Sequence, residues 1–219
     1  MRNALRAVTA GLGLLALLSG CVVNAPPVAE RTPDGLVRIQ SKQVDTVYAA
    51  PGLTLAPYHR VMLDSVDLAF KLDWEKRHPE VSESDISRIR SQGAAVFYEI
   101  FSAALSMNGG YPLTTQPGPD VLRVTASITE LDVAATPGSV GTQRMYVVSP
   151  SDLTLLMELR DSRSGALLVR AIDREKGRSF GNLQVADSVA NSAEARRALE
   201  MWAGLLRGAL DSARAAPKP

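Results

Sequence analysis

The sequence predicts an α+β domain in which an antiparallel sheet of about five to six strands packs against two helices. Residues 121–133 alternate apolar and polar side chains, which is typical of a half-buried strand, and residues 153–175 hold two such runs around a turn. Residues 82–108 and 186–215 repeat their apolar positions at helical spacing. Neighbouring strands with short turns favour antiparallel pairing, and the expected order is β-β-α-β-β-β-β-α.

The N-terminus, residues 1–20, is expected to be a signal peptide. Arg2 and Arg6 precede an apolar run over residues 7–18. That run is too short for a helix that crosses a bilayer, which takes roughly 20 residues. A basic start followed by a short apolar run is typical of secretory signals.

The apolar run ends in Leu18-Ser19-Gly20-Cys21, and Cys21 is the only cysteine of the chain. This stretch resembles the lipobox of bacterial lipoproteins, in which the cysteine thiol receives a diacylglyceryl group and cleavage falls just before the cysteine. The resemblance implies that acylated Cys21 anchors the chain in a lipid bilayer, because two or more acyl chains hold a protein firmly. The alternative is an ordinary secretory signal with a chance cysteine at its boundary.

Val22 follows the cysteine, where lipoproteins retained in the inner membrane tend to have aspartate. The lipobox resemblance therefore implies the periplasmic face of the outer membrane, with the inner membrane as the less favoured alternative. Residues 21–36 are expected to be the lipidated cysteine and a Pro-rich tether, extended by up to roughly 45 Å. A single domain, 37–215, and a disordered tail, 216–219, are expected to follow.

The first half of the domain is expected to hold strands and one helix. Residues 44–52 predict a short strand that ends at a Pro-Gly turn. Residues 61–70 change the parity of their apolar positions midway, which predicts either one strand with a bulge near Asp64-Ser65 or two strands. After a charged connector, 73–81, a typical helix start at Ser82 leads to a typical end at 108–110.

The second half is expected to be mainly sheet, closed by a helix. Residues 111–115 predict a short strand ahead of the strand 121–133. Residues 136–151 are expected to be either a loop or a region with one more strand. The hairpin over 153–175 turns at 161–165, where Gly165 supplies a positive φ. Trp202 lies on the apolar stripe of the last helix and is expected in the core.

Three residues are candidates for binding a protein partner. Trp74 lies in the charged connector, and Arg144 and Tyr146 lie in the segment 136–151. Aromatic and arginine side chains are enriched where binding energy concentrates in interfaces. The alternatives are that Trp74 caps the core and that Tyr146 belongs to a strand.

Composition argues against several other functions. Residues 1–20 hold two arginines and no acidic residue, so the remaining chain has 22 basic and 23 acidic residues, and no basic block suggests nucleic acid. His59 and His78 are the only histidines, and with Cys21 lipidated no zinc spacing remains, so we expect no metal and no cofactor. A hydrolase that uses His59, Asp64 and a serine is a lesser alternative, because no G-x-S-x-G motif occurs.

Five segments in this order resemble an uncharacterised bacterial lipoprotein family, domain of unknown function 3313, over roughly residues 35–215. They are VDTVYAAPGLTLAPYHRVMLDSVDLAF, DISRIRSQGAAVFYEIFSAAL, GPDVLRVTASITEL, LMELRDSRSGALLVRAIDRE and the final helix with Trp202. Membership implies an envelope lipoprotein with an α+β domain and no known activity.

The expected function is that of a non-enzymatic, membrane-anchored envelope lipoprotein that binds or braces another envelope component. A narrower alternative is an accessory subunit of a transport or cell-wall synthesis complex. A periplasmic hydrolase is the third and least favoured interpretation.

Overall fold

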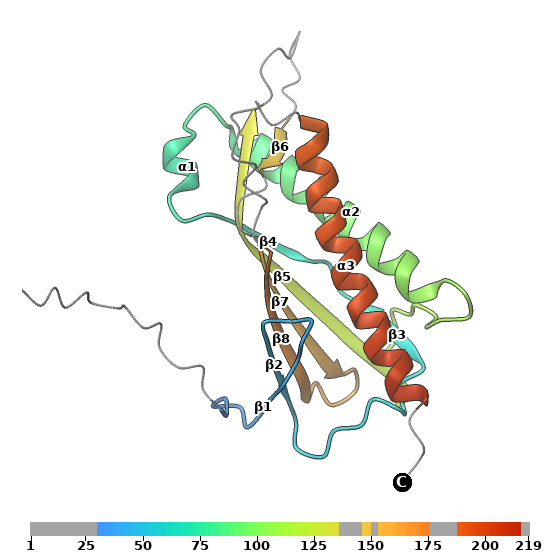
Figure 1. Ribbon diagram of the computed structural model, residues 1–219. Coiled ribbons are helices and arrows are strands. Elements are labelled where there is room, and N and C mark those ends of the chain that lie inside the picture. The colour runs from blue at the N-terminus through green and yellow to red at the C-terminus, as the bar shows by residue number, and fades with distance from the viewer. Residues whose placement is uncertain (1–29, 136–145, 150–152, 176–187, 216–219) are drawn as a thin grey trace, which may run out of the picture.

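The computed structural model describes residues 30–135, 146–149, 153–175 and 188–215. Within them the chain forms an α+β fold in two layers, with α2 and α3 side by side on one face of a twisted sheet (Figure 1). The strands are β1 Val37–Ile39, β2 Thr46–Ala49, β3 Arg60–Leu63, β4 Asp67–Phe70, β5 Val121–Ala135, β6 Tyr146–Ser149, β7 Leu153–Asp161 and β8 Leu167–Glu175; the helices are α1 Trp74–Arg77, α2 Glu83–Ser106 and α3 Ser188–Ala215.

Strand β5 pairs with more strands of the sheet than any other described strand does. Its 15 residues pair with β3 and β4 in parallel and with β6 and β7 antiparallel. Residues 122–129 pair with β7, and residues 132–135 pair with β6. Glu130 lies between these two segments with a positive φ of 64°, at the irregularity where the register with β4 shifts. This bulge allows one strand to serve two partners in succession.

The sheet is mixed, so the prediction of a purely antiparallel sheet was wrong. Helix α2 carries the chain from the end of β4 back to the start of β5, and a strand that follows such a crossover runs parallel to the strand before it. The antiparallel prediction rested on short turns between neighbouring strands, whereas the long connection through α2 sets the direction of β5.

The described residues also hold more strands than expected, eight instead of five or six, in the order β1-β2-β8-β7-β5-β3 with β4 and β6 on β5. Residues 61–70 form two strands, one of the two forms predicted, and a third, short helix, α1, lies in the charged connector. Strand β6 settles the alternatives for residues 136–151 in favour of a region with a strand. The expected strand at 111–115 is only an isolated bridge between Leu113 and Val61.

The domain begins earlier than expected. Residues 30–36 were assigned to the tether, yet Arg31 bridges to Val37 and the Thr32 amide donates to the Leu36 carbonyl at 2.9 Å. Leu36 is 2% exposed. An apolar side chain buried to this degree belongs to the folded unit, so residues 30–36 are part of the domain.

Helix α2 begins where the sequence places it. Ser82 is its N-cap, and its Oγ accepts a hydrogen bond from the Asp85 amide at 3.2 Å. At the other end, the Arg207 guanidinium of α3 donates to the carbonyl oxygens of Ala104 and Met107 at 3.1 and 2.9 Å. The last carbonyls of a helix have no partner within it, so Arg207 satisfies them and ties α2 to α3.

The core lies between the helices and the inward face of the sheet. Leu153, Leu155, Met157 and Leu159 alternate inward along β7, and Phe97, Phe101 and Leu105 of α2 meet Trp202, Leu206 and Leu210 of α3. The intervening residues of β7 face the other side of the sheet. The prediction that this alternation marks a half-buried strand is confirmed.

We expect Leu159→Asp to lower the free energy of unfolding by about 3–5 kcal/mol, because it puts a carboxylate among apolar side chains where the leucine is 5% exposed. Thr154→Asp, on the opposite face of the same strand beside the register partner Arg174, is the matched control and should change it by less than about 1 kcal/mol. Urea unfolding measures both. Equal effects would contradict the assignment of the two faces.

Candidate functional site

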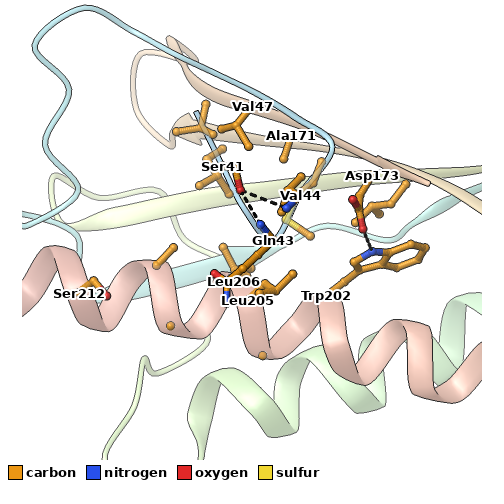
Figure 2. Close-up of a pocket in the computed structure, with 17 residues that line it drawn as sticks. Ser41, Gln43, Val44, Val47, Ala171, Asp173, Trp202, Leu205, Leu206 and Ser212 are labelled. Carbon is orange, nitrogen blue, oxygen red and sulfur yellow. Dashed lines mark hydrogen bonds between the residues drawn. The ribbon is translucent and has the colours of Figure 1, made fainter. Parts of the chain in front are cut away.

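A cavity of about 510 Å³ lies between α3 and the inward faces of β2, β7 and β8 (Figure 2). Leu155, Met157 and Leu159 of β7 and Val47 of β2 contribute to one wall. Leu205 and Leu206 of α3 contribute to the other, and Ser41 and Gln43 in the loop before β2 form part of the rim. Its size falls within the range of about 300–1,000 Å³ that is usual for small-molecule sites.

The cavity exists because two helices do not cover the whole sheet. Val47 pairs in register with Ala171, so both point inward, yet they lie beyond the strands that α2 and α3 cover. Helix α3 meets this region with Gly204 and Gly208, where an added Cβ would find no atom within 4 Å. The inward face of β2 and β8 therefore stays partly open.

One end of the cavity is fixed by a buried carboxylate. Asp173 of β8 is 7% exposed, and its Oδ2 accepts from the Trp202 indole Nε1–H at 2.8 Å. Its Oδ1 accepts from the Asp45 backbone amide at 3.0 Å, while Asp45 Oδ2 accepts from the Arg174 amide at 3.1 Å. This clip, Asp45–Asp173–Trp202, joins the loop before β2, strand β8 and helix α3. A buried carboxylate needs such donors, so both of its oxygens are engaged.

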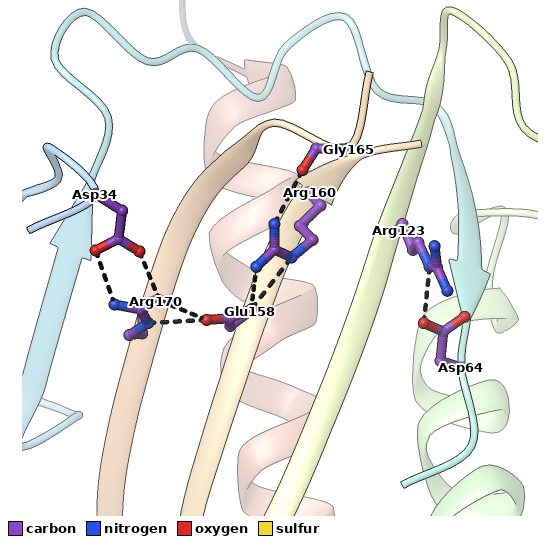
Figure 3. A network of polar contacts seen from close by, with 7 residues as sticks. All are labelled: Asp34, Asp64, Arg123, Glu158, Arg160, Gly165 and Arg170. Carbon is purple, nitrogen blue, oxygen red and sulfur yellow. Dashed lines mark hydrogen bonds and ion pairs between the residues drawn. The ribbon is translucent and has the colours of Figure 1, made fainter. Parts of the chain in front are cut away.

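The opposite face of the sheet carries ion pairs (Figure 3). Glu158 of β7 accepts from Arg160 Nη2 at 2.6 Å and from Arg170 Nε at 2.8 Å. Arg170 also donates to Asp34 at 2.7 Å, and Arg123 donates to Asp64 at 2.8 Å. Positive and negative groups are matched here, so this face does not gather charge of one sign.

Arginine contacts set the protonation of these carboxylates. Burial acts to raise the pKa of Glu158, but the hydrogen bonds from Arg160 and Arg170 outweigh it, and the pKa lies below its ordinary value of 4.5. The hydrogen bond from Arg170 likewise lowers the pKa of Asp34. Both groups are therefore charged at neutral pH and hold the outer face in place.

The Trp74 side chain is buried and is not exposed on the surface of the domain. It is 1% exposed and stacks between Phe70 and His78, with ring centroids 4.5 and 4.7 Å away. Val81 and Ile89 complete this small cluster at the start of α2. A side chain with almost no exposed surface offers no area to a partner, so this position favours the core role of Trp74 over the partner-binding role.

The other candidate residues lie partly outside the described part of the chain. Tyr146 lies in β6 opposite Ala135 of β5, and Arg144 and Cys21 lie outside the described residues. His59 is exposed, and its ring makes no hydrogen bond to any described residue. The triad of the hydrolase interpretation, which was the least favoured one, is thus not assembled around His59 in the described part of the chain.

The described residues contain neither a cluster of metal ligands nor a membrane-spanning helix. They hold no group of three or more His, Cys, Asp or Glu side chains placed to bind a metal ion. Among the helices of the same residues, none has the length and apolar character that a membrane span requires.

Residues 32–206 match the model of a protein family described as protein of unknown function (DUF3313). The chain belongs to this family. The match covers most of the sequence and includes every wall of the cavity up to Leu206, so the cavity lies largely within the DUF3313 domain. No curated protein matches the chain.

Solved structures resemble the DUF3313 domain only distantly. The PelC dodecamer from Paraburkholderia phytofirmans is 14% identical, with a TM-score of 0.33 and coverage of 71% of this chain and 95% of that one. A putative neuraminyllactose-binding hemagglutinin homolog from Helicobacter pylori is 13% identical, with a TM-score of 0.37 and coverage of 80% and 92%. Likeness at this level says nothing about the function of this chain.

The clip and the cavity were not predicted from the sequence, although both leave a signal in the sequence of the DUF3313 domain. Asp173 has the same parity as Val169 and Ala171, so alternation already places a carboxylate on the inward face of β8. Gly204 and Gly208 lie inside the last helix, where glycine lowers helix stability. Their presence therefore indicates that small residues are needed at these positions. Both signals are visible only once the two elements are known to face each other.

We expect Asp173→Ala to lower the free energy of unfolding by about 2–4 kcal/mol, because it leaves the Trp202 indole and the Asp45 amide without an acceptor. Trp202→Phe removes the same hydrogen bond from the other side. A double-mutant cycle measured by urea unfolding should give a coupling energy of about 1–3 kcal/mol. Additive effects would show that the hydrogen bond contributes nothing.

The lowered pKa of Glu158 predicts a dependence of stability on pH. A carboxylate whose pKa is lower in the folded state stabilises the fold above its unfolded pKa, and this contribution is lost as the pH falls through the folded pKa. Stability should therefore fall as the pH drops below about 4.5. In Glu158→Gln the fall should be shallower and stability at pH 7 lower.

Glu200→Gln is the matched control for this prediction. Glu200 is exposed on α3 and forms no ion pair with a described residue, so the substitution should leave the profile of unfolding free energy against pH unchanged. The measurement is a series of urea unfolding curves at stepped pH. Identical profiles for Glu158→Gln and the unmodified chain would refute the role of Glu158.

Proposed function

We propose that the chain is an envelope lipoprotein, anchored through acylated Cys21 on the periplasmic face of the outer membrane, whose domain binds another envelope component without catalysing a reaction. The observation that carries the proposal is Leu18-Ser19-Gly20-Cys21, which puts the only cysteine of the chain at the end of a short apolar run. A thiol with no possible partner for an internal disulfide is well explained by lipidation.

The start of the domain supports this arrangement. Leu36 is buried and the Glu30 carbonyl accepts from the Arg38 amide, so the proposed tether is shortened to residues 22–29. Eight residues with two prolines, Pro26 and Pro27, span up to about 25 Å in an extended form. The domain is thereby kept close to the membrane surface, nearer than the full segment 21–36 would allow.

The binding role is supported by the kind of site that the domain offers. The domain has an apolar cavity beside α3, which has the size and lining of a binding site. Its one carboxylate, Asp173, is held by hydrogen bonds within the domain. Such a site favours capture of an apolar group over proton transfer to a substrate.

Lipidation is tested by replacing the cysteine. Cells that express the chain are grown with labelled palmitate and then separated into inner-membrane, outer-membrane and soluble fractions. We expect label on the unmodified chain in the outer-membrane fraction, and no label on Cys21→Ser, which should keep residues 1–20 and run correspondingly larger.

Ser19→Ala is the matched control, because it keeps a small residue before the cysteine and should be labelled like the unmodified chain. Equal labelling of Cys21→Ser would refute anchoring through Cys21. If the labelled chain is found in the inner-membrane fraction, the outer-membrane location is refuted, while anchoring through Cys21 stands.

A further inference from the structure

The cavity beside α3 runs along the helix. Trp202 and Ser212 line its two ends (Figure 2), and ten residues of α-helix span about 15 Å. Its volume is about 510 Å³. Gly204, Gly208 and Ser212 are exposed residues, so the slot is open to solvent along one side.

The lining of the slot is mainly apolar. Leucine, valine, methionine and alanine side chains form most of the lining, and no lysine or arginine contributes. Asp173 is the only charged residue of the lining, and both of its oxygens already accept hydrogen bonds from the domain. A ligand inside the slot gains from leaving water and needs no polar group of its own.

The length of the slot favours an acyl chain as its occupant. The hydrocarbon core of a bilayer is about 30 Å thick, so one acyl chain of one leaflet extends over about 15 Å. The length of the slot matches this value, and its apolar lining suits an unbranched hydrocarbon.

We propose that the slot between α3 and strands β2, β7 and β8 binds one acyl chain of a membrane lipid, whose headgroup stays in solvent along the open side. The proposal rests in part on the proposed function, because a tether of residues 22–29 keeps the slot close to a bilayer. Gly204 and Gly208 make room on the helical wall, where a side chain would project into the slot.

Tryptophan fluorescence tests the proposal directly. Only Trp74 and Trp202 are present, and Trp202 lines the slot while Trp74 lies in the other cluster. The full lipidated chain is reconstituted into phosphatidylcholine vesicles whose acyl chains carry bromine, which quenches an indole in contact. We expect a loss of Trp202 fluorescence relative to vesicles without bromine.

Gly204→Leu with Gly208→Leu fills the slot and should abolish the quenching, while Gly204→Ala with Gly208→Ala should retain it. An added Cβ meets no atom within 4 Å at either position, and leucine and alanine favour a helix over glycine, so both variants should fold; thermal unfolding checks this. Where Trp74 obscures the signal, Trp74→Phe leaves Trp202 as the only indole. Absent quenching in the unmodified chain, or equal quenching in the filled variant, overturns the proposal.

Occupation of the slot by the acyl chain on Cys21 itself is an outcome that also overturns it. That chain carries no bromine, so it would protect Trp202 in the lipidated chain and leave it open in Cys21→Ser. Flotation of the vesicles reports the anchor separately. A chain that does not float refutes the proposed anchoring, and titration of that chain with free brominated stearate then still decides whether the slot binds an acyl chain.

Discussion

The pairing of β5 with four other strands is the constraint on which the rest of the fold depends. Its 15 residues hold β3 and β4 in parallel and β6 and β7 antiparallel, and the left-handed backbone at Glu130 divides the strand between its partners. Because α2 must return the chain to the start of β5, that helix is placed across the inward face of the sheet. The core, the α2–α3 contact and the capping of α2 by Arg207 all follow from this placement.

The same constraint explains where the fold is open. Two helices side by side cover the strands around β5, but the sheet continues outward through β7 and β8 to β2 and β1. The inward residues of the outer strands have no third helix above them, and they face Gly204 and Gly208 of α3 across the slot. The Asp45–Asp173–Trp202 clip closes one end and fixes how far α3 stands from β8. An open apolar strip of this kind is costly in water, and a hydrocarbon ligand removes the cost.

Local patterns in the sequence predicted the elements well and their arrangement less well. The start of α2 at Ser82, the alternation in β7 and the positive φ of Gly165 are decided by neighbouring residues, and all three are confirmed. The direction of β5 and the inclusion of Leu36 in the domain depend on contacts between distant residues, which periodicity does not contain. The slot was missed for the same reason, because its two walls are 29 or more residues apart, as Asp173 and Trp202 are.

The register of β2 on β8 has a consequence for how the chain acquires its fold. Thr46 pairs with Ile172, and the Asp45 amide binds Asp173, so the first strands of the domain find their partner only after most of the chain has been made. Contacts between such distant residues slow folding, since a long loop must close before they form. During synthesis from the N-terminus, β1 and β2 therefore stay unpaired with the rest of the sheet until β8 has been made. The two strands at this edge of the sheet are thus the first to be made and among the last to take their place in it.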